Sequence, residues 1–245
     1  MDISQEVAFF DSFELRHGDY DVLGERAYRR LLGLFGKLVE PQQGERCIDL
    51  GCGSGAFTRR LAAFQLDLTG LDISPRCIEA AGRASTHERY LVGDIRDTSL
   101  HDGAADIIVY SGALHHFTQK AARVETLKEG YRILRPGGRL FAFDPSAHSP
   151  SMWLYRDPRS PLYSSNGKTE NEVLLTRQHI RQELEEAGFI PVSVRGASGI
   201  FYRYVEDRFA RLILPLYNLY EEIIRFSPLE DRLGTFLVSF AIKPD

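Results

Sequence analysis

The first 145 residues alternate short apolar runs with longer stretches in which apolar residues recur at helical spacing. The run at 47–50 stops at three alternating glycines, Gly51, Gly53 and Gly55, and a helical pattern begins at Ala56. Short runs bounded by turn residues predict buried strands, and their alternation with helices predicts parallel βαβ units. Further strands are predicted at 68–72, 89–92, 106–110 and 140–143, with helices beginning at Ser74-Pro75 and over 119–134.

The flanking segments are less regular. Residues 9–39 end in leucines and aromatics at helical spacing, which predicts a helical arm. Residues 145–175 hold several prolines and serines and predict a long loop. Beyond a helix at 176–187 and a strand at 190–194, residues 199–231 predict one or two amphipathic helices that Pro215 breaks or kinks. The last predicted strand is 235–242.

The glycine turn is the first candidate binding site. Glycines reach positive φ and allow close approach of a ligand, and the next helix offers N–H groups to a polar or anionic group. Asp72 ends the following strand about 20 residues later, where an acid accepts the hydroxyls of a ribose. However, Gly51-x-Gly53-x-x-Ala56 also fits the fingerprint of NAD and FAD sites. The turn alone therefore predicts a nucleotide without identifying it.

Four segments taken together narrow the choice. They are IDLGCGSG at 48–55, GLDIS with its acid Asp72, VGDI with its acid Asp94, and LRPGGRL at 134–140. In this order they resemble the class I S-adenosylmethionine-dependent methyltransferases of the small-molecule type, closely over about 46–144. An NAD site predicts neither Asp94 nor the Arg-Pro-Gly-Gly turn, so NAD is the weaker interpretation.

The resemblance implies a Rossmann-like, doubly wound α/β fold with a seven-stranded, mostly parallel sheet whose last strand is antiparallel. We expect a single methyltransferase domain over 1–245. Within it, 1–40 would form a helical arm and 46–144 the cofactor-binding core. The loop at 145–175 and the helical insertion at 199–231 would cover the acceptor.

The resemblance also implies the residues that hold S-adenosylmethionine. The glycine turn and Asp49 would lie at the methionine part, Asp72 at the ribose, and Asp94 with Ile95 at the adenine. The alternatives are structural: Asp49 capping the turn, Asp72 complementing a helix dipole, and Asp94 standing as a solvated loop acid. The expected cofactor residues are Asp49, Gly51, Cys52, Gly53, Asp72, Ile73, Asp94, Ile95 and Ser111.

His115 and His116 directly follow the fourth strand, at the edge where open α/β sheets bind ligands. A histidine there can accept a proton from an acceptor near neutral pH, so His115 is the candidate catalytic base. The alternative is that both histidines are polar loop residues, and that proximity alone drives the transfer.

The expected function is methyl transfer to oxygen or nitrogen of a small molecule. The alternatives are carbon methylation, another enzymatic use of the same cofactor, or a non-catalytic protein that binds it as a regulator or partner subunit. For the acceptor, the aromatics offer candidates whose alternative role is ordinary packing. They are Trp153, Tyr155, Tyr163 and Tyr202, beside His116, with Tyr20 and Tyr28 as weaker ones.

Composition and charge limit the expected partners and location of the protein. The net charge of −4 and the sequence pI near 6.0 create no field that would attract nucleic acid. Cys47, Cys52 and Cys77 form neither an even disulfide framework nor a metal-ligand spacing, so no metal is expected. Neither an apolar signal core nor a run long enough to span a bilayer is apparent, which favours the cytoplasm. A homodimer remains open.

Overall fold

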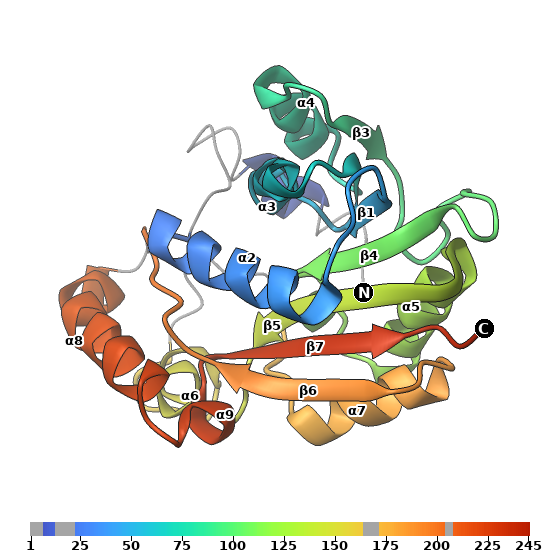
Figure 1. The fold of residues 1–245 in the computed structure, drawn as a ribbon. Helices are drawn as coiled ribbons and strands as arrows, with labels where there is room; N and C mark the ends of the chain where they lie inside the picture. The colour runs from blue at the N-terminus through green and yellow to red at the C-terminus, as the bar shows by residue number, and fades with distance from the viewer. Residues whose placement is uncertain (1–6, 13–22, 164–171, 204–207) are drawn as a thin grey trace.

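A computed structural model describes residues 7–12, 23–163, 172–203 and 208–245. Its centre is a seven-stranded sheet with the spatial order β3-β2-β1-β4-β5-β7-β6 (Figure 1). The strands are β1 (Arg46–Leu50), β2 (Asp67–Asp72), β3 (Arg89–Val92), β4 (Ala105–Ser111), β5 (Leu134–Pro145), β6 (Val192–Ala197) and β7 (Phe236–Ile242).

The five strands from β3 to β5 are parallel, whereas β7 runs antiparallel to both β5 and β6. This arrangement confirms the predicted sheet with its antiparallel last strand. The parallel register brings the carboxyl ends of β1, β2 and β4 to one edge, since Asp49 pairs with both Gly70 and Val109. The order of the strands reverses between β1 and β4, and ligands bind at such a switch point in open α/β sheets.

Two apolar layers cover the sheet because strand side chains alternate between its faces. Along β4, Ile107 and Val109 join one buried cluster, while Ile108 and Tyr110 join the other. The first cluster contains α2 (Glu25–Val39) and α3 (Ala56–Leu61), and the second contains α5 (Lys120–Ile133) and α7 (Arg177–Glu186). Figure 1 shows α2 in front of the strands and α5 and α7 behind them.

The remaining helices lie at the ends of the sheet. They are α4 (Pro75–Ala84) near β3, and α6 (Pro150–Arg156), α8 (Arg208–Arg225) and α9 (Glu230–Leu233), which gather together in Figure 1. Short 3₁₀ helices, η1 (Ala62–Phe64) and η2 (Leu114–His116), follow α3 and β4. Within the described ranges, no helix is both long and apolar enough to cross a membrane.

The structure adds detail to one sequence-based expectation and corrects two. The arm predicted at 9–39 overlaps a helical segment at 7–12 and includes α2, whereas residues 13–22 lie outside the described part. The loop predicted at 145–175 contains α6, whose first turn is capped by Ser149. Finally, α8 continues through Pro215, which lies on the exposed side where water can bond the carbonyl that loses its partner.

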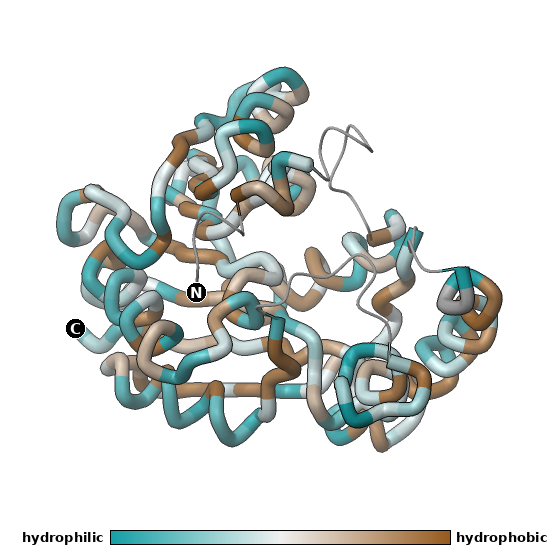
Figure 2. The backbone as a smooth tube through the Cα atoms, turned by 180° about the vertical axis from the view of Figure 1, so that it is seen from behind, coloured by the Kyte–Doolittle hydropathy of each residue, from teal (hydrophilic) through white to brown (hydrophobic). Residues whose placement is uncertain are grey.

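Helix α8 also exposes much of its apolar surface. Leu212 and Leu216 are 75% and 68% exposed. The opposite side of the helix holds the fully buried Glu221, whose carboxylate accepts a hydrogen bond from the Ile200 N–H at 2.8 Å and another from the Thr235 hydroxyl. Hydrophobic positions recur along this helix at the edge of the molecule (Figure 2). The buried carboxylate thus attaches the amphipathic helix to the end of the sheet.

Candidate functional site

A pocket opens at the carboxyl ends of β1, β2 and β4. Its floor is the glycine turn, and its cover comes from distant segments, including Phe10 near the N-terminus and Tyr202 before α8. The lining residues are Phe10, Leu23, Tyr28, Gly51, Cys52, Gly53, Ala56, Phe57, Asp72, Ile73, Asp94, Ile95, Ser111, Gly112, Ala113, His115, His116, Phe117, Phe143, Pro145, Arg156, Glu172, Tyr202 and Phe236.

The glycine turn needs its glycines. Gly51 has φ 79° and Gly53 has φ 54°, a region that other residues rarely adopt. A Cβ at Gly51 would also meet the Cβ of Ala113 at 2.6 Å. The turn therefore leaves bare backbone along the pocket floor, where a ligand can approach closely.

Asp49 lies beneath this floor rather than in the lining. Its carboxylate is fully buried and accepts hydrogen bonds from the Thr58 hydroxyl at 2.6 Å and the Ser111 hydroxyl at 2.7 Å. Burial raises the pKa of Asp49 to about 6, although these two hydroxyls oppose the rise. Asp49 thereby ties the end of β1 to α3 and β4 and supports the turn from below.

Asp72 lies in the pocket wall and braces two neighbouring turns. Its carboxylate accepts the Gly53 N–H at 2.8 Å and the Ser74 N–H at 2.9 Å. Ser74 in turn caps α4 by accepting the Cys77 N–H, as the Ser-Pro signal predicts. Burial raises the pKa of Asp72, with the backbone N–H groups opposing the rise. The carboxylate is fixed while still forming part of the pocket surface.

Asp94 follows β3 and pairs with Arg96. The Arg96 Nη2 lies 2.5 Å from Asp94 Oδ2, and the Arg96 N–H donates to Oδ1 at 2.9 Å. Partial burial raises the pKa of Asp94, but the Arg96 hydrogen bonds outweigh it and hold this pKa below its ordinary value. Asp94 is therefore an ionised acceptor, with the buried Ile95 beside it in the wall.

His115 is held by a buried acid that was not among the site residues predicted from the sequence. Asp144, the penultimate residue of β5, lies with Oδ1 2.9 Å from His115 Nδ1 and 3.0 Å from the His115 backbone nitrogen. Burial raises the pKa of Asp144 to about 7 despite these bonds. An acid ending a parallel strand beside β4 was a usable signal, since both strand ends meet at one edge.

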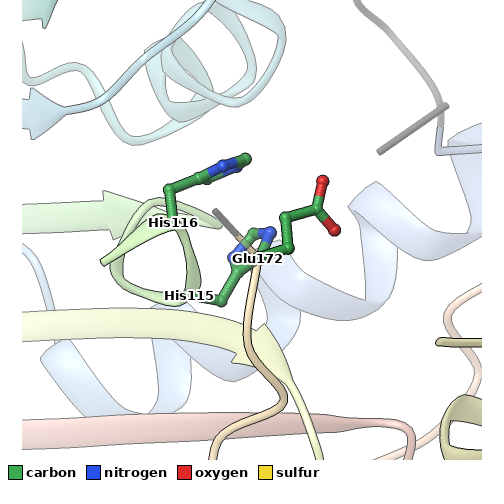
Figure 3. Close-up of side chains that lie close together, drawn as sticks. All are labelled: His115, His116 and Glu172. Carbon is green, nitrogen blue, oxygen red and sulfur yellow. The ribbon is translucent and has the colours of Figure 1, made fainter. Parts of the chain in front are cut away.

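Arg156 and Glu172 also line the pocket, and both were missed. They form an ion pair with each other, and both side chains are largely buried. The segment after Glu172 is tethered by the Val173 N–H, which donates to the His115 carbonyl at 2.9 Å. Figure 3 shows the Glu172 side chain close to His115 and His116. The sequence carries no local signal for this meeting, because it depends on tertiary folding.

The predicted acceptor residues divide into two groups. His116, Tyr202 and Tyr28 line the pocket, whereas Trp153, Tyr155 and Tyr163 are absent from its lining. Trp153 and Tyr163 are 38% and 43% exposed. The prolines of this segment predicted a loop, but it contains the short helix α6. This helix contributes Arg156, and not Trp153 or Tyr155, to the pocket lining. Tyr20 lies outside the described residues.

Comparison with known proteins adds a family. A family model described as "Methyltransferase domain" matches residues 48–142. An uncharacterized methyltransferase of Synechocystis is 31% identical over 150 residues, which cover 61% of this chain and 68% of that protein. The 27-O-demethylrifamycin SV methyltransferase of Amycolatopsis mediterranei is 30% identical over 194 residues, covering 75% of this chain and 69% of the relative. By contrast, the match to a malonyl-[acyl-carrier protein] O-methyltransferase of Serratia marcescens covers only 52% of that enzyme.

Solved structures share the fold over nearly the whole chain. A putative methyltransferase solved in complex with the Haloferax volcanii Trm112 methyltransferase activator matches with TM-score 0.69 and 19% identity, covering 97% of both chains. A possible histamine N-methyltransferase from Thermotoga maritima matches with TM-score 0.65 and 18% identity, covering 96% of this chain and 99% of the other. With the sheet, the glycine turn and the sequence relatives, these matches show that the chain is a class I methyltransferase that uses S-adenosylmethionine.

Proposed function

We propose that this enzyme transfers the methyl group of S-adenosylmethionine to an oxygen or nitrogen atom of a small-molecule acceptor. The observation that carries the proposal is the His115–Asp144 pair, because His115 lines the same pocket as the glycine turn, Asp72 and Asp94 while Asp144 holds its ring from behind. A proton acceptor beside a methyl-donor site suits an acceptor that loses a proton, as hydroxyl and ammonium groups do.

The pocket residues fit the cofactor. The backbone of Gly51, Cys52 and Gly53 and the side of Ser111 border the space for the methionine part, and Asp49 lies behind them. Asp72 would accept the ribose hydroxyls. Its two backbone hydrogen bonds fix the carboxylate in advance, which lowers the ordering cost of binding.

The adenine would lie between strand-end residues. Ile73 and Ile95 supply apolar contacts in the wall, and the Asp94 carboxylate would accept from the exocyclic amine. The Arg96 pair keeps that carboxylate ionised and in place. This donor and acceptor set supports the assignment of eight of the nine expected cofactor residues to one ligand, with Asp49 supporting the turn from below.

The bound cofactor supplies an electrophilic methyl group on a sulfonium. The chain's task is then to hold an acceptor atom in line with that methyl group and to take up its proton. The Nδ1 atom of His115 lies 2.9 Å from Asp144 Oδ1, and an Nδ1–H donated there would leave the lone pair on Nε2. His115 would accept the proton at Nε2, and Asp144 would orient the ring and stabilise its charged form.

The cover of the pocket supports an acceptor with apolar parts. Phe10, Tyr202 and Phe236 contribute aromatic surface from three separate segments. Tyr202 contacts Tyr217 of α8 with ring centroids 5.5 Å apart, and the Tyr217 hydroxyl donates to the Ile200 carbonyl at 2.7 Å. The N-terminal arm and the insertion at 199–231 would thus form a lid within one catalytic domain. Two of the sequence relatives are O-methyltransferases, which supports an oxygen atom rather than a nitrogen atom as the acceptor.

The deciding experiment measures product from a panel of small hydroxyl and amine compounds with wild type, His115→Ala, His115→Asn and the surface control His179→Ala. Loss of the base should lower the turnover number by about 10²–10⁴ with little change in cofactor affinity. The control should match wild type because His179 is exposed on α7. If His115→Asn retains the wild-type rate, the histidine only shapes the pocket. Cofactor binding without any product would favour a non-catalytic role, and a methylated carbon would replace the oxygen or nitrogen assignment.

A further inference from the structure

Three side chains in the pocket bring metal-ligating atoms together. One ring nitrogen each from His115 and His116 and a carboxylate oxygen from Glu172 all lie within 4.8 Å of one another. His115 is buried and the other two are half-buried. Figure 3 shows the two rings one above the other, with the glutamate beside them. Two imidazoles and one carboxylate form a donor set that suits zinc and other divalent transition metals.

The fold, not the sequence spacing, creates this cluster. The histidines share η2, and their ring centroids are 4.2 Å apart. Glu172 arrives from more than 50 positions later, because the Val173 N–H bonds to the His115 carbonyl and the Leu175 N–H bonds to the Pro145 carbonyl. Two backbone hydrogen bonds therefore hold the glutamate segment against the end of the sheet.

Outer hydrogen-bond partners orient the ligands His115 and Glu172. His115 Nδ1 lies 2.9 Å from the buried Asp144 carboxylate, which directs Nε2 to serve as the ligand atom. Arg156 donates to Oε2 of Glu172, and its side chain is 17% exposed. Histidine ligands typically donate their second nitrogen to a carboxylate, and ligating carboxylates are themselves hydrogen-bonded. The cluster thus has both the ligand atoms of a metal centre and the hydrogen-bonding groups that orient such ligands.

We propose that His115, His116 and Glu172 bind one divalent transition-metal ion, with Asp144 and Arg156 as orienting partners. Three protein ligands leave one position of a tetrahedral ion, which water would fill on the pocket side. A consequence rests on the proposed function: the metal takes the same Nε2 lone pair that His115 would use as a base. Metal binding and proton transfer therefore exclude each other, and the ion inhibits methyl transfer.

The test uses the full-length protein freed of metal with a chelator that is then removed. Zinc chloride is titrated by calorimetry, and cobalt chloride is followed by visible absorption. We expect one equivalent to bind, with a cobalt spectrum typical of nitrogen and oxygen ligands and without a thiolate charge-transfer band. The missing thiolate band would separate this site from binding at Cys52, which also lines the pocket.

The variants are Glu172→Gln, His116→Ala and the exposed control His179→Ala. Each ligand variant should weaken zinc binding by at least roughly tenfold, the scale on which even an outer partner matters, while the control binds as wild type does. Binding of S-adenosylhomocysteine and the thermal midpoint serve as folding checks. Equal zinc binding by wild type and both ligand variants, or no cobalt spectrum in folded wild type, would overturn the metal site and leave the methyltransferase assignment untouched. Undiminished turnover of the zinc-loaded enzyme would overturn the inhibition.

Discussion

At the scale of single residues, buried carboxylates stabilise the strand ends and turns around the pocket, independently of any ligand. Asp49, Asp72 and Asp144 each accept hydrogen bonds that brace a strand end or a turn. Each is buried, and burial raises the pKa of each. Replacing one of these acids therefore tests both a binding contact and a brace, so each test needs a control for folding.

Asp72→Ala should weaken the binding of S-adenosylhomocysteine by at least tenfold, because each charge-assisted hydrogen bond to the ribose contributes about 1.5–3 kcal/mol. Calorimetry measures the dissociation constant. The matched control is Asp67→Ala at the start of the same strand, whose exposed side chain pairs with Arg89. An unchanged dissociation constant in a folded Asp72→Ala protein would remove the ribose assignment.

The candidate residues that sequence reasoning took from local motifs line one pocket, whereas it did not include lining residues that meet through tertiary folding. The glycine turn, Asp72 and Asp94 follow directly from strand-end patterns, and the pocket includes all of them. Arg156 and Glu172 come from a stretch whose prolines predict only a loop. Trp153 and Tyr163 were chosen because large aromatics often line pockets. However, Trp153 lies on helix α6, and that helix contributes Arg156 rather than Trp153 to the pocket lining. Residue type alone does not reveal the direction of a side chain.

At the scale of elements, the helical insertion connects the pocket cover to the sheet. Sequence patterning predicted its amphipathic character, and the helix has a buried side and an exposed side. The pattern could not predict that α8 continues through Pro215, because that depends on which side of the helix the proline occupies. Two predictions concern this element.

Tyr202→Ala should raise the KM for the acceptor while leaving cofactor affinity nearly unchanged, because Tyr202 lines the pocket from the segment before α8 and is not one of the residues assigned to the cofactor. Steady-state kinetics with a working acceptor measures the change. Trp153→Ala is the matched control, since its ring is absent from the lining. An equal rise in KM for both variants would argue against a lid at Tyr202.

Glu221 should make stability depend on pH. Burial raises its pKa from 4.5 to about 7, with Thr235 and the Ile200 N–H opposing the rise. Between these values the folded state keeps a proton that the unfolded state has released, so this contribution is full below about pH 4.5 and is lost as pH rises towards 7. It amounts to at most about 3 kcal/mol.

Urea unfolding of wild type and Glu221→Gln from acidic to neutral pH tests this coupling. The glutamine variant cannot ionise, so its free energy of unfolding should fall less steeply over that range. Glu222→Gln is the control, because Glu222 is an exposed neighbour paired with Arg26. Identical slopes for Glu221→Gln and wild type would show that Glu221 ionises normally in the folded protein.

At the scale of the whole molecule, one ligand would join several strands. The proposed cofactor site takes residues from the ends of β1, β2, β3 and β4. A ligand that binds only the folded state stabilises it by mass action, by about 2.7 kcal/mol at a hundred times its dissociation constant. For a domain of this size, S-adenosylhomocysteine should then raise Tm by roughly 5–10 °C. Differential scanning fluorimetry measures the shift, and NAD at the same concentration should give none.

The position of β7 has a consequence for biosynthesis. This strand is made after the other six strands of the sheet, yet it lies between β5 and β6 rather than at an edge. While the ribosome is still extending the chain, the strands from β1 to β5 can already pair, but the backbone along the open side of β5 lacks its neighbour. An unpaired apolar strand edge invites pairing with other chains. Nascent protein therefore passes through an interval in which a chaperone, or rapid completion of the last strand, protects it from aggregation.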